Sequence, residues 1–221
     1  MTIEDIAVSD HDCPGVHLPA PPRISYIVST YEDVRYLPCC LWSLHAQSDQ
    51  DFEVIITDNS TTEEMRDRIR GMAKSIFPDC LCIATAQPTC FHSAELGVAH
   101  ARGEFVCFPS DDSYYVPVFG EVMYRAAGEA NVDFVICDIL YDPRRGFPGY
   151  GVSEQHPRRG WFDKTGFILR RDKFTLFPDK ALHYGFREGP VADCPDGLLA
   201  ESLVAAGVRF IELRNVLVVH N

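Results

Sequence analysis

Two adjacent carboxylates, Asp111 and Asp112, directly follow a hydrophobic run in the segment "FVCFPSDDSYYVP". Holding carboxylates beside a core strand costs free energy unless hydrogen bonds or a cation neutralise them. The pair therefore has three candidate roles, which are a turn, a helix cap or the ligation of a cation. Two neighbouring carboxylates offer the hard oxygen ligands that Mg²⁺ and Mn²⁺ prefer.

Polar residues also follow two earlier strand-like runs. Ser29, Thr30 and Tyr31 come at the end of "RISYIVST", and "DNS" (58–60) ends "DFEVIITDNS". In an open parallel sheet, ligands bind beyond the carboxyl ends of the strands, so all three groups would meet at one edge. Each group alone could simply cap a helix or form a turn. Their joint position at successive strand ends favours a shared site.

The elements that would position these residues alternate between strand and helix. Val34, Leu37, Leu41 and Leu44 have helical spacing, with Pro38 in the first turn, where proline is tolerated. A Thr61-x-x-Glu64 capping box opens a second helix. We expect strands over 23–30, 51–58, 80–85, 104–112 and 132–140, and helices over 32–47, 61–72, 92–104, 118–128 and 196–207.

This alternation predicts an α/β fold with a mainly parallel sheet and helices on both faces. The prolines of residues 1–22 indicate a tail or strap, and residues 23–221 a single domain. Residues 141–161 are rich in Gly, Pro and Arg without periodicity and are expected to form a long loop. "KTGFILRRDKF" resumes order, and two strands are expected within "VRFIELRNVLVVHN" (208–221).

The composition argues against several functional classes. Lys and Arg total 20 against 32 Asp and Glu, a net charge of −12, which disfavours a nucleic-acid binder or a protein held on anionic lipid. The nine cysteines form no C-x-x-C motif and no zinc-like spacing, and most lie in apolar runs. Without a secretory signal or an apolar run of bilayer length, we expect a cytoplasmic protein with reduced cysteines and no integral membrane segment.

Several segments, in this order and spacing, resemble a known family. "ISYIVSTYEDVRYLPCCLWSLHAQSDQDFEVIITDNST" is similar to the start of the GT-A-fold, inverting nucleotide-sugar glycosyltransferases, the large family that includes cellulose- and hyaluronan-synthase catalytic domains. "LGVAHARGEFVCFPSDDSYYVP" is similar to the family's Gly-x-x-x-Ala-x-Gly-Glu-Tyr-Ile segment, which leads into a DxD-type metal site. The resemblance is strong over residues 23–128 and thinner afterwards, where "GFILRRDKF", "PDGLLAESLVAAGVRF" and "VLVVHN" fit the closing pattern.

The resemblance implies a GT-A, Rossmann-like fold with a nucleotide-binding half (23–128) and an acceptor-binding half (129–221). It assigns Asp112 as the ligand of a Mn²⁺ or Mg²⁺ ion and Asp111 to the ribose or sugar. Ser110 stands where many relatives have a first aspartate. Nucleotide-sugar binding is further expected of Ser29, Thr30, Tyr31 and, at the nucleobase, Asp58.

The general base of an inverting transferase deprotonates the acceptor hydroxyl as it attacks. Aligned to the family's late helix, Asp196 matches the base, with Asp193 as the second choice; Asp196 could alternatively be only the helix N-cap. His220 matches a histidine that completes the metal site in some relatives. Trp161 could stack on a sugar or lie in the core. The loop arginines Arg144, Arg145, Arg158 and Arg159 could clamp phosphates or be solvated surface.

The expected function is metal-dependent, inverting transfer of a sugar from a nucleoside-diphosphate sugar, UDP-linked by default, to a hydroxyl acceptor of open class. Glu32 and Glu95 depart from the family's common asparagines, and with Ser110 they support an alternative, a non-catalytic scaffold on a degenerate glycosyltransferase fold. A sugar-phosphate nucleotidylyltransferase would need a Gly-rich, Arg-containing loop after the first strand. This chain has "STYEDVRY" there, which disfavours that class. The oligomeric state stays open.

Overall fold

The computed structural model describes residues 20–85, 90–141, 151–176 and 195–220. They form a nine-stranded sheet in the order β3-β2-β1-β4-β8-β6-β9-β5, with β7 paired to β6. The strands are β1 Ile24–Thr30, β2 Phe52–Asp58, β3 Leu81–Ala84, β4 Phe105–Cys107, β5 Ser113–Tyr115, β6 Phe134–Tyr141, β7 Gly151–Ser153, β8 Phe167–Arg170 and β9 Phe210–His220. The helices are α1 Leu37–His45, α2 Glu63–Ile76, α3 Cys90–His100, α4 Phe119–Ala130, α5 Pro195–Ala205 and the short 3-10 helix η2 Arg171–Leu176.

The predicted α/β class is confirmed, but parallel pairing is concentrated in the first half of the chain. Strands β3, β2, β1 and β4 pair in parallel, and helices α1, α2 and α3 supply the crossovers that such pairing requires. Further along, β8 runs antiparallel to both β4 and β6, while β9 runs parallel to β6 and antiparallel to β5. The sheet as a whole is therefore mixed.

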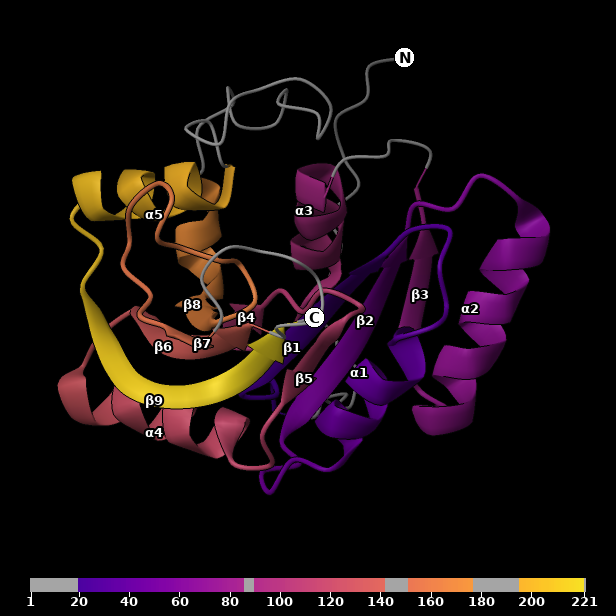
Figure 1. The fold of residues 1–221 in the computed structure, drawn as a ribbon, viewed down its shortest axis with the longest axis horizontal. Coiled ribbons are helices and arrows are strands. Elements are labelled where there is room, and N and C mark those ends of the chain that lie inside the picture. Colours follow the sequence, from indigo (N-terminus) through magenta and orange to yellow (C-terminus); the bar gives the residue numbers. More distant parts are fainter. Residues whose placement is uncertain (1–19, 86–89, 142–150, 177–194, 221) are drawn as a thin grey trace, which may run out of the picture.

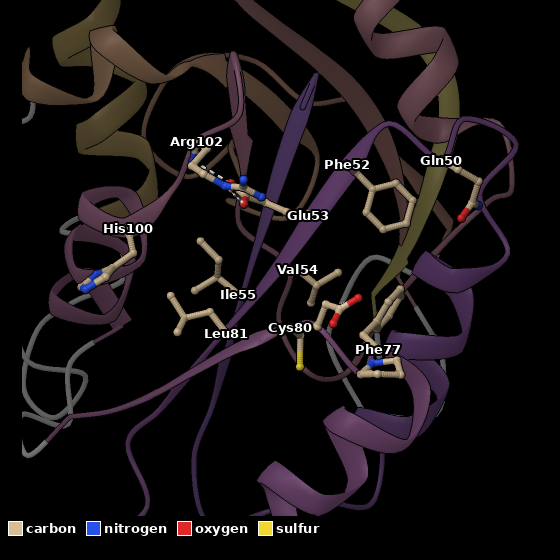
Figure 2. A pocket seen from close by; sticks show the side chains of 12 residues that line it. Gln50, Phe52, Glu53, Val54, Ile55, Phe77, Cys80, Leu81, His100 and Arg102 are labelled. Atoms are coloured by element: carbon tan, nitrogen blue, oxygen red, sulfur yellow. Dashed lines mark hydrogen bonds and ion pairs between the residues drawn. The ribbon is translucent and has the colours of Figure 1, made fainter. Parts of the chain in front are cut away.

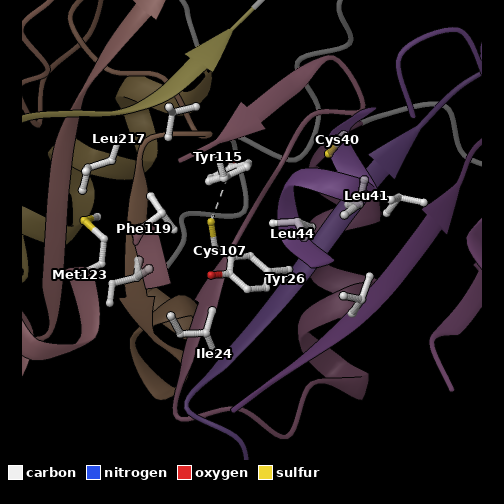
Figure 3. Close-up of a cluster of buried hydrophobic side chains, with 14 of the residues drawn as sticks. Ile24, Tyr26, Cys40, Leu41, Leu44, Cys107, Tyr115, Phe119, Met123 and Leu217 are labelled. Atoms are coloured by element: carbon white, nitrogen blue, oxygen red, sulfur yellow. Dashed lines mark hydrogen bonds between the residues drawn. The ribbon is translucent and has the colours of Figure 1, made fainter. Parts of the chain in front are cut away.

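Helices cover both faces of this curved sheet, with α3 and α5 on one side and α1 and α4 on the other (Figure 1). The alternation of side chains along β1 explains the two layers, because Tyr26 and Val28 join one buried cluster and Ile27 joins the other. The first cluster packs β1 against α1 and α4 (Figure 3). Both layers anchor β1, whose end carries the Ser29–Tyr31 segment.

The structure corrects several expectations about element boundaries. The strand expected over 104–112 ends at Cys107, and the segment expected as a loop over 141–161 contains strand β7. The first helix begins at Leu37 and not at Glu32, because Glu32 has φ 52°, a left-handed conformation that interrupts a helix. The second helix is capped by Thr62, whose hydroxyl accepts from the Met65 N–H, and not by Thr61. The expected pair of closing strands is one strand, β9, whose pairing with β6 shifts register on both sides of Asp138.

Within the ranges described above, no helix has both the length and the apolarity to cross a bilayer. Six cysteines there are free thiols, most of them buried: Cys39, Cys40, Cys80, Cys82, Cys107 and Cys137.

Candidate active site

A pocket of about 350 Å³ lies at the carboxyl ends of β1 and β4. An isolated bridge between Ser29 and Ser110 continues the β1–β4 pairing beyond β4, so the two strand ends stay side by side at its rim. Most of the residues singled out in the sequence meet here. The lining consists of Ser29, Thr30, Tyr31, Asn59, Ser110, Asp111, Asp112, Asp163, Lys164, Asp196 and His220.

Asp111 is oriented by the end of β1. The Thr30 hydroxyl donates a 2.9 Å hydrogen bond to Asp111 Oδ2, and Thr30 itself is buried. Burial raises the pKa of Asp111 to about 6; the Thr30 hydrogen bond opposes this shift and the adjacent Asp112 adds to it. Asp111 thus has a fixed orientation and one remaining oxygen for a polar ligand.

Asp112 faces His220 across the pocket. The Asp112 Oδ1 atom lies 3.4 Å from His220 Nε2, while His220 Nδ1 lies 2.8 Å from Asp163 Oδ2. Burial lowers the pKa of His220, but Asp163 and Asp112 outweigh burial and raise it to about 10. The imidazole thus bridges two carboxylates that lie 51 residues apart in sequence.

Asp196 approaches the pocket from the first turn of α5. Its Oδ2 accepts a 3.2 Å hydrogen bond from the Lys164 backbone N–H, so its contact is with the opposite wall and the simple N-cap alternative is not supported. The helix can come this close because Gly197 has no side chain; a Cβ there would lie 2.4 Å from the Arg159 Cα. Burial and then Asp163 raise the pKa of Asp196 to about 6.

The pocket is lined by more acidic than basic side chains. Its lining has four carboxylates but only two cationic side chains, Lys164 and His220. Such a pocket repels a diphosphate unless a bound cation reverses the local field.

The residues present fit a small divalent cation. Two octahedral ligands at 2.0–2.1 Å stand roughly 3 Å apart when adjacent, close to the 3.4 Å between Asp112 Oδ1 and His220 Nε2. Across the described ranges, no three His, Cys, Asp or Glu side chains gather in a metal-binding group. Mg²⁺ commonly takes one or two protein ligands and completes its shell with water and substrate phosphates, so two ligands suffice.

Two of the expected site residues do not line this pocket, and a third lies outside the described residues. Asp58 is buried and accepts the Ser60 N–H at 2.8 Å, which makes it part of a local turn, and its neighbour Asn59 reaches the pocket instead. Trp161 is 51% exposed and lies beneath the Arg158 guanidinium, 4.7 Å from its ring centroid. Asp193 falls outside the described residues, so all three roles stay predictions.

The structure gives little support to the idea that the loop arginines clamp phosphates. Arg158 stacks on Trp161 and Arg159 pairs with Glu201 at 2.9 Å, so both guanidinium groups already have protein partners. Arg144 and Arg145 lie outside the described residues.

Sequence reasoning missed Asp163 and Lys164. Both follow a segment without periodicity, and without periodicity the residue spacing does not indicate which side chains face the pocket. Their only signal is position, two and three residues after Trp161 and shortly before the ordered segment "GFILRRDKF". Asn59 was part of the noted "DNS" segment but had no role assigned.

Glu32 forms hydrogen bonds that hold the loop beside the pocket. Its carboxylate accepts from both the N–H and the hydroxyl of Thr61, and its own N–H donates to Ser60 Oγ at 3.1 Å. These hydrogen bonds lower the pKa of Glu32. They join the segment after β1 to the segment after β2 and fix the chain next to Tyr31.

A wider hollow of about 560 Å³ lies at the other end of β2 and β3. Figure 2 shows Phe52, Phe77 and Leu81 on its walls, and Glu53 joined to Arg102. The Glu53 carboxylate is occupied by Ser25 and Arg102 at 2.7 and 2.9 Å. Of the site residues expected from the sequence that the structure describes, none lines this hollow.

Comparison with known proteins shows which family the chain resembles. A model of the family described as glycosyl transferase family 2 matches residues 25–186. EpsH of Bacillus subtilis (strain 168), named as a candidate glycosyltransferase, is 30% identical over 117 residues. The match covers 53% of this chain and 33% of that protein, so the chain spans about a third of the length of this relative.

Solved structures share the fold. S. aureus TarS (1–349) in complex with UDP matches with a TM-score of 0.65 at 19% identity, covering 89% of this chain and 60% of that chain. The mannosyltransferase PcManGT from Pyrobaculum calidifontis, in complex with GDP-Man and Mn²⁺, matches with a TM-score of 0.62 at 21% identity, covering 90% and 57%. The expected GT-A architecture is thereby confirmed.

Proposed function

The chain belongs to glycosyl transferase family 2, and from this premise we propose that it transfers a sugar from a nucleoside-diphosphate sugar to a hydroxyl acceptor, with a divalent cation and with inversion. One observation carries the proposal, the convergence of Asp111, Asp112 and Asp196 on a single pocket. They come from the β4–β5 turn and from α5, segments that only the fold brings together.

The donor's diphosphate would bind beside Asp112 and His220, which are the proposed ligands of a Mn²⁺ or Mg²⁺ ion. When bound, such an ion neutralises the charge that develops on the leaving nucleoside diphosphate. Asp111, fixed by Thr30, would accept a hydrogen bond from a ribose or sugar hydroxyl. Ser29 and Tyr31 would complete the wall on the nucleotide side.

Asp196 is the proposed general base. In the transfer, the acceptor oxygen bonds to the anomeric carbon, the bond from that carbon to the phosphate oxygen breaks, and the hydroxyl proton passes to Asp196. A carboxyl whose pKa lies near 6 is ionised at neutral pH yet more basic than an ordinary aspartate. The Lys164 N–H holds one of its oxygens and leaves the other free. Asp193 is retained as the second choice.

UDP is the proposed donor nucleotide. Among the structures with this fold, TarS is seen with UDP and with UDP-GlcNAc, and PcManGT with GDP-Man and Mn²⁺. One of these two proteins is thus seen with uridine nucleotides and one with a guanosine nucleotide, so UDP is the first donor to test and GDP the second.

Calorimetry and a donor screen test the proposal. UDP with Mn²⁺ is expected to give a saturable heat of binding, and one UDP-sugar in a panel of UDP- and GDP-sugars is expected to be turned over. The Asp112→Ala variant should lose the Mn²⁺-dependent heat while keeping its thermal transition. If neither UDP nor GDP gives a signal with Mn²⁺, the function is wrong and the non-catalytic scaffold is favoured.

A further inference from the structure

We propose that Asp163 is a positioning residue, which fixes the imidazole of His220 so that Nε2 is presented to the cation site beside Asp112. This inference rests on the proposed function, because it assigns a role at the same site. The juxtaposition of Asp163, His220 and Asp112 carries it: two carboxylates hold opposite edges of one imidazole ring.

The Asp163 carboxylate has no capacity left for a ligand. Its Oδ1 accepts from the N–H and the hydroxyl of Thr165 at 2.9 and 2.8 Å, and its Oδ2 accepts from Tyr141 Oη at 3.0 Å and from His220 Nδ1 at 2.8 Å. Four donors satisfy the usual capacity of a carboxylate. Asp163 therefore acts on the site through its hydrogen-bond partners, and it is neither a metal ligand nor a base.

The backbone around Asp163 is also fixed. Its N–H donates to Gln155 Oε1 at 2.9 Å, and its carbonyl accepts from the Gly166 N–H at 3.3 Å. The side chain of Asp163 is only 13% exposed. A carboxylate that is held in this way offers His220 a stationary acceptor.

The His220 ring has a single orientation in this environment. It stacks on Tyr141 with centroids 5.7 Å apart and an interplanar angle of 29°. Tyr141 on β6 and Ser113 on β5 are the sheet partners of His220, so the end of β9 is held on both sides. Stacking fixes the plane of the ring, and the hydrogen bond to Asp163 fixes its rotation within that plane.

This orientation determines which nitrogen serves the cation. Because Nδ1 is engaged by Asp163, Nε2, the atom that faces Asp112 at 3.4 Å, is the ring nitrogen that remains for a cation. Metal-binding histidines generally donate their other N–H to a carboxylate or carbonyl in this way. An amide at position 163 would place a donor near Nδ1 and so favour the tautomer that has its proton on Nε2.

The test is the binding of Mn²⁺ to the full chain, measured by electron paramagnetic resonance with and without UDP. The Asp163→Asn variant is expected to bind Mn²⁺ about 10–100-fold more weakly than the wild type. Asp133→Asn is the matched control, because Asp133 is similarly buried, with a side chain 15% exposed, and pairs with Arg170 far from the pocket. It should bind Mn²⁺ as the wild type does.

A double-mutant cycle separates positioning from general structural damage. In a His220→Ala background, Asp163→Asn should cause no further loss of Mn²⁺ affinity, because the residue through which Asp163 acts is absent. An equal loss in both backgrounds, or wild-type affinity in Asp163→Asn, overturns the inference. If Asp163→Asn does not fold, Asp163→Glu takes its place, with a loss of at least threefold expected only when His220 is present.

The two proposals fail in different ways. A wild-type protein that binds no Mn²⁺ in the presence of UDP contradicts the metal-dependent function itself. A wild-type protein that binds Mn²⁺ with UDP, together with an unaffected Asp163→Asn variant, contradicts only the role of Asp163.

Discussion

The Thr30 hydroxyl donates a 2.9 Å hydrogen bond to Asp111 Oδ2, which joins two residues 81 positions apart in sequence. Thr30 ends β1, and Asp111 lies in the turn between β4 and β5. The bond continues the contact between the two strand ends that the Ser29–Ser110 bridge begins. Through it, the core strand β1 determines where a carboxylate of the pocket points.

Replacing Thr30 with Val should weaken nucleotide binding. The substitution keeps the shape but leaves Asp111 without its donor, and a hydrogen bond to a charged group contributes about 1.5–3 kcal/mol, or roughly 10–100-fold in affinity. Calorimetric titration with UDP and Mn²⁺ measures the change. Thr57→Val is the control, because the Thr57 hydroxyl has longer contacts, 3.4 Å to Val28 O and to Ser29 Oγ. Equal affinities in the two variants would contradict the role of Thr30.

Replacing Asp112 with Asn should remove the metal dependence of donor turnover. The amide keeps the size of the side chain but loses the charge that faces His220 at 3.4 Å. We expect donor hydrolysis to fall at least 100-fold and to respond little to Mn²⁺ between micromolar and millimolar concentrations. Hydrolysis rates at graded Mn²⁺ measure both effects. A Mn²⁺ titration curve like that of the wild type would exclude Asp112 as a ligand.

The transfer rate should fall as the pH decreases through about 6, because the proposed base Asp196 has its pKa raised to about 6. Below that pH the carboxyl is protonated and cannot accept the acceptor's proton. Initial rates at saturating donor and acceptor give the profile. Asp196→Asn should reduce kcat by two orders of magnitude or more and remove this limb of the profile. A variant with kcat within threefold of the wild type would rule out Asp196 as the base.

The same substitution should stabilise the protein. Because burial and Asp163 raise the folded-state pKa above the usual value of 3.8, the fold favours protonated Asp196, and this contribution is lost as the pH rises from about 4 through 6. A pKa raised from 3.8 to about 6 corresponds to roughly 1–3 kcal/mol of folding free energy at neutral pH, after allowance for the partial exposure of the side chain. Urea unfolding without metal or nucleotide should find Asp196→Asn more stable than the wild type at pH 7 and similar at pH 4. A destabilised variant at pH 7 would contradict the raised pKa.

Glu32, which is half-buried, should matter for the position of the loop after β1. Its φ of 52° is unfavourable for a side chain with a Cβ, and its hydrogen bonds to Thr61 hold it there. Glu32→Ala loses those bonds and keeps the strain, whereas asparagine tolerates the left-handed region. We expect the thermal midpoint to fall more for Glu32→Ala than for Glu32→Asn, and UDP affinity to fall in both. Identical melting curves for the two variants would contradict this account.

Two helical glycines should respond oppositely to alanine. A Cβ on Gly97 would lie 2.2 Å from Ile27 Cγ2, so Gly97→Ala overpacks the contact between α3 and β1 and should destabilise by about 1–3 kcal/mol. Gly71 on α2 is exposed with nothing within 4 Å, so Gly71→Ala should stabilise by about 0.5–1 kcal/mol. Urea unfolding of both variants gives the comparison. Destabilisation of similar size in both would show that the close packing of α3 is not the cause.

The sequence was sufficient to predict that the ends of β1 and β4 meet, although at the end of β2 it favoured Asp58 over its neighbour Asn59. Thr30 and Asp111 each follow an apolar run, and the rule that ligands bind at strand carboxyl ends brings them together. Asp163 could not be predicted in this way, because its neighbours lack periodicity and its partner His220 is 57 residues away. Only the tertiary structure defines that pair.

Local competition explains the smaller errors. By its spacing, Thr61 fits the first position of a capping box. Its hydroxyl donates to Glu32 instead, and Thr62 caps the helix. Likewise, the closing segment reads as two strands because its pattern changes in the middle, where β9 shifts register against β6 and continues. In both places a residue or strand distant in sequence, Glu32 in the first and β6 in the second, determines the local structure.

The insertion of β9 between β6 and β5 has a consequence for the order of folding. Strand β5 pairs with β9 across about a hundred residues, whereas β1 and β2 meet across fewer than thirty. Loop closure over such a separation is slow, so the parallel β1–β2–β3 layer should gain protection from hydrogen exchange before the β5–β9 pair does. The wall that carries His220 would then be completed after the strands on the nucleotide side.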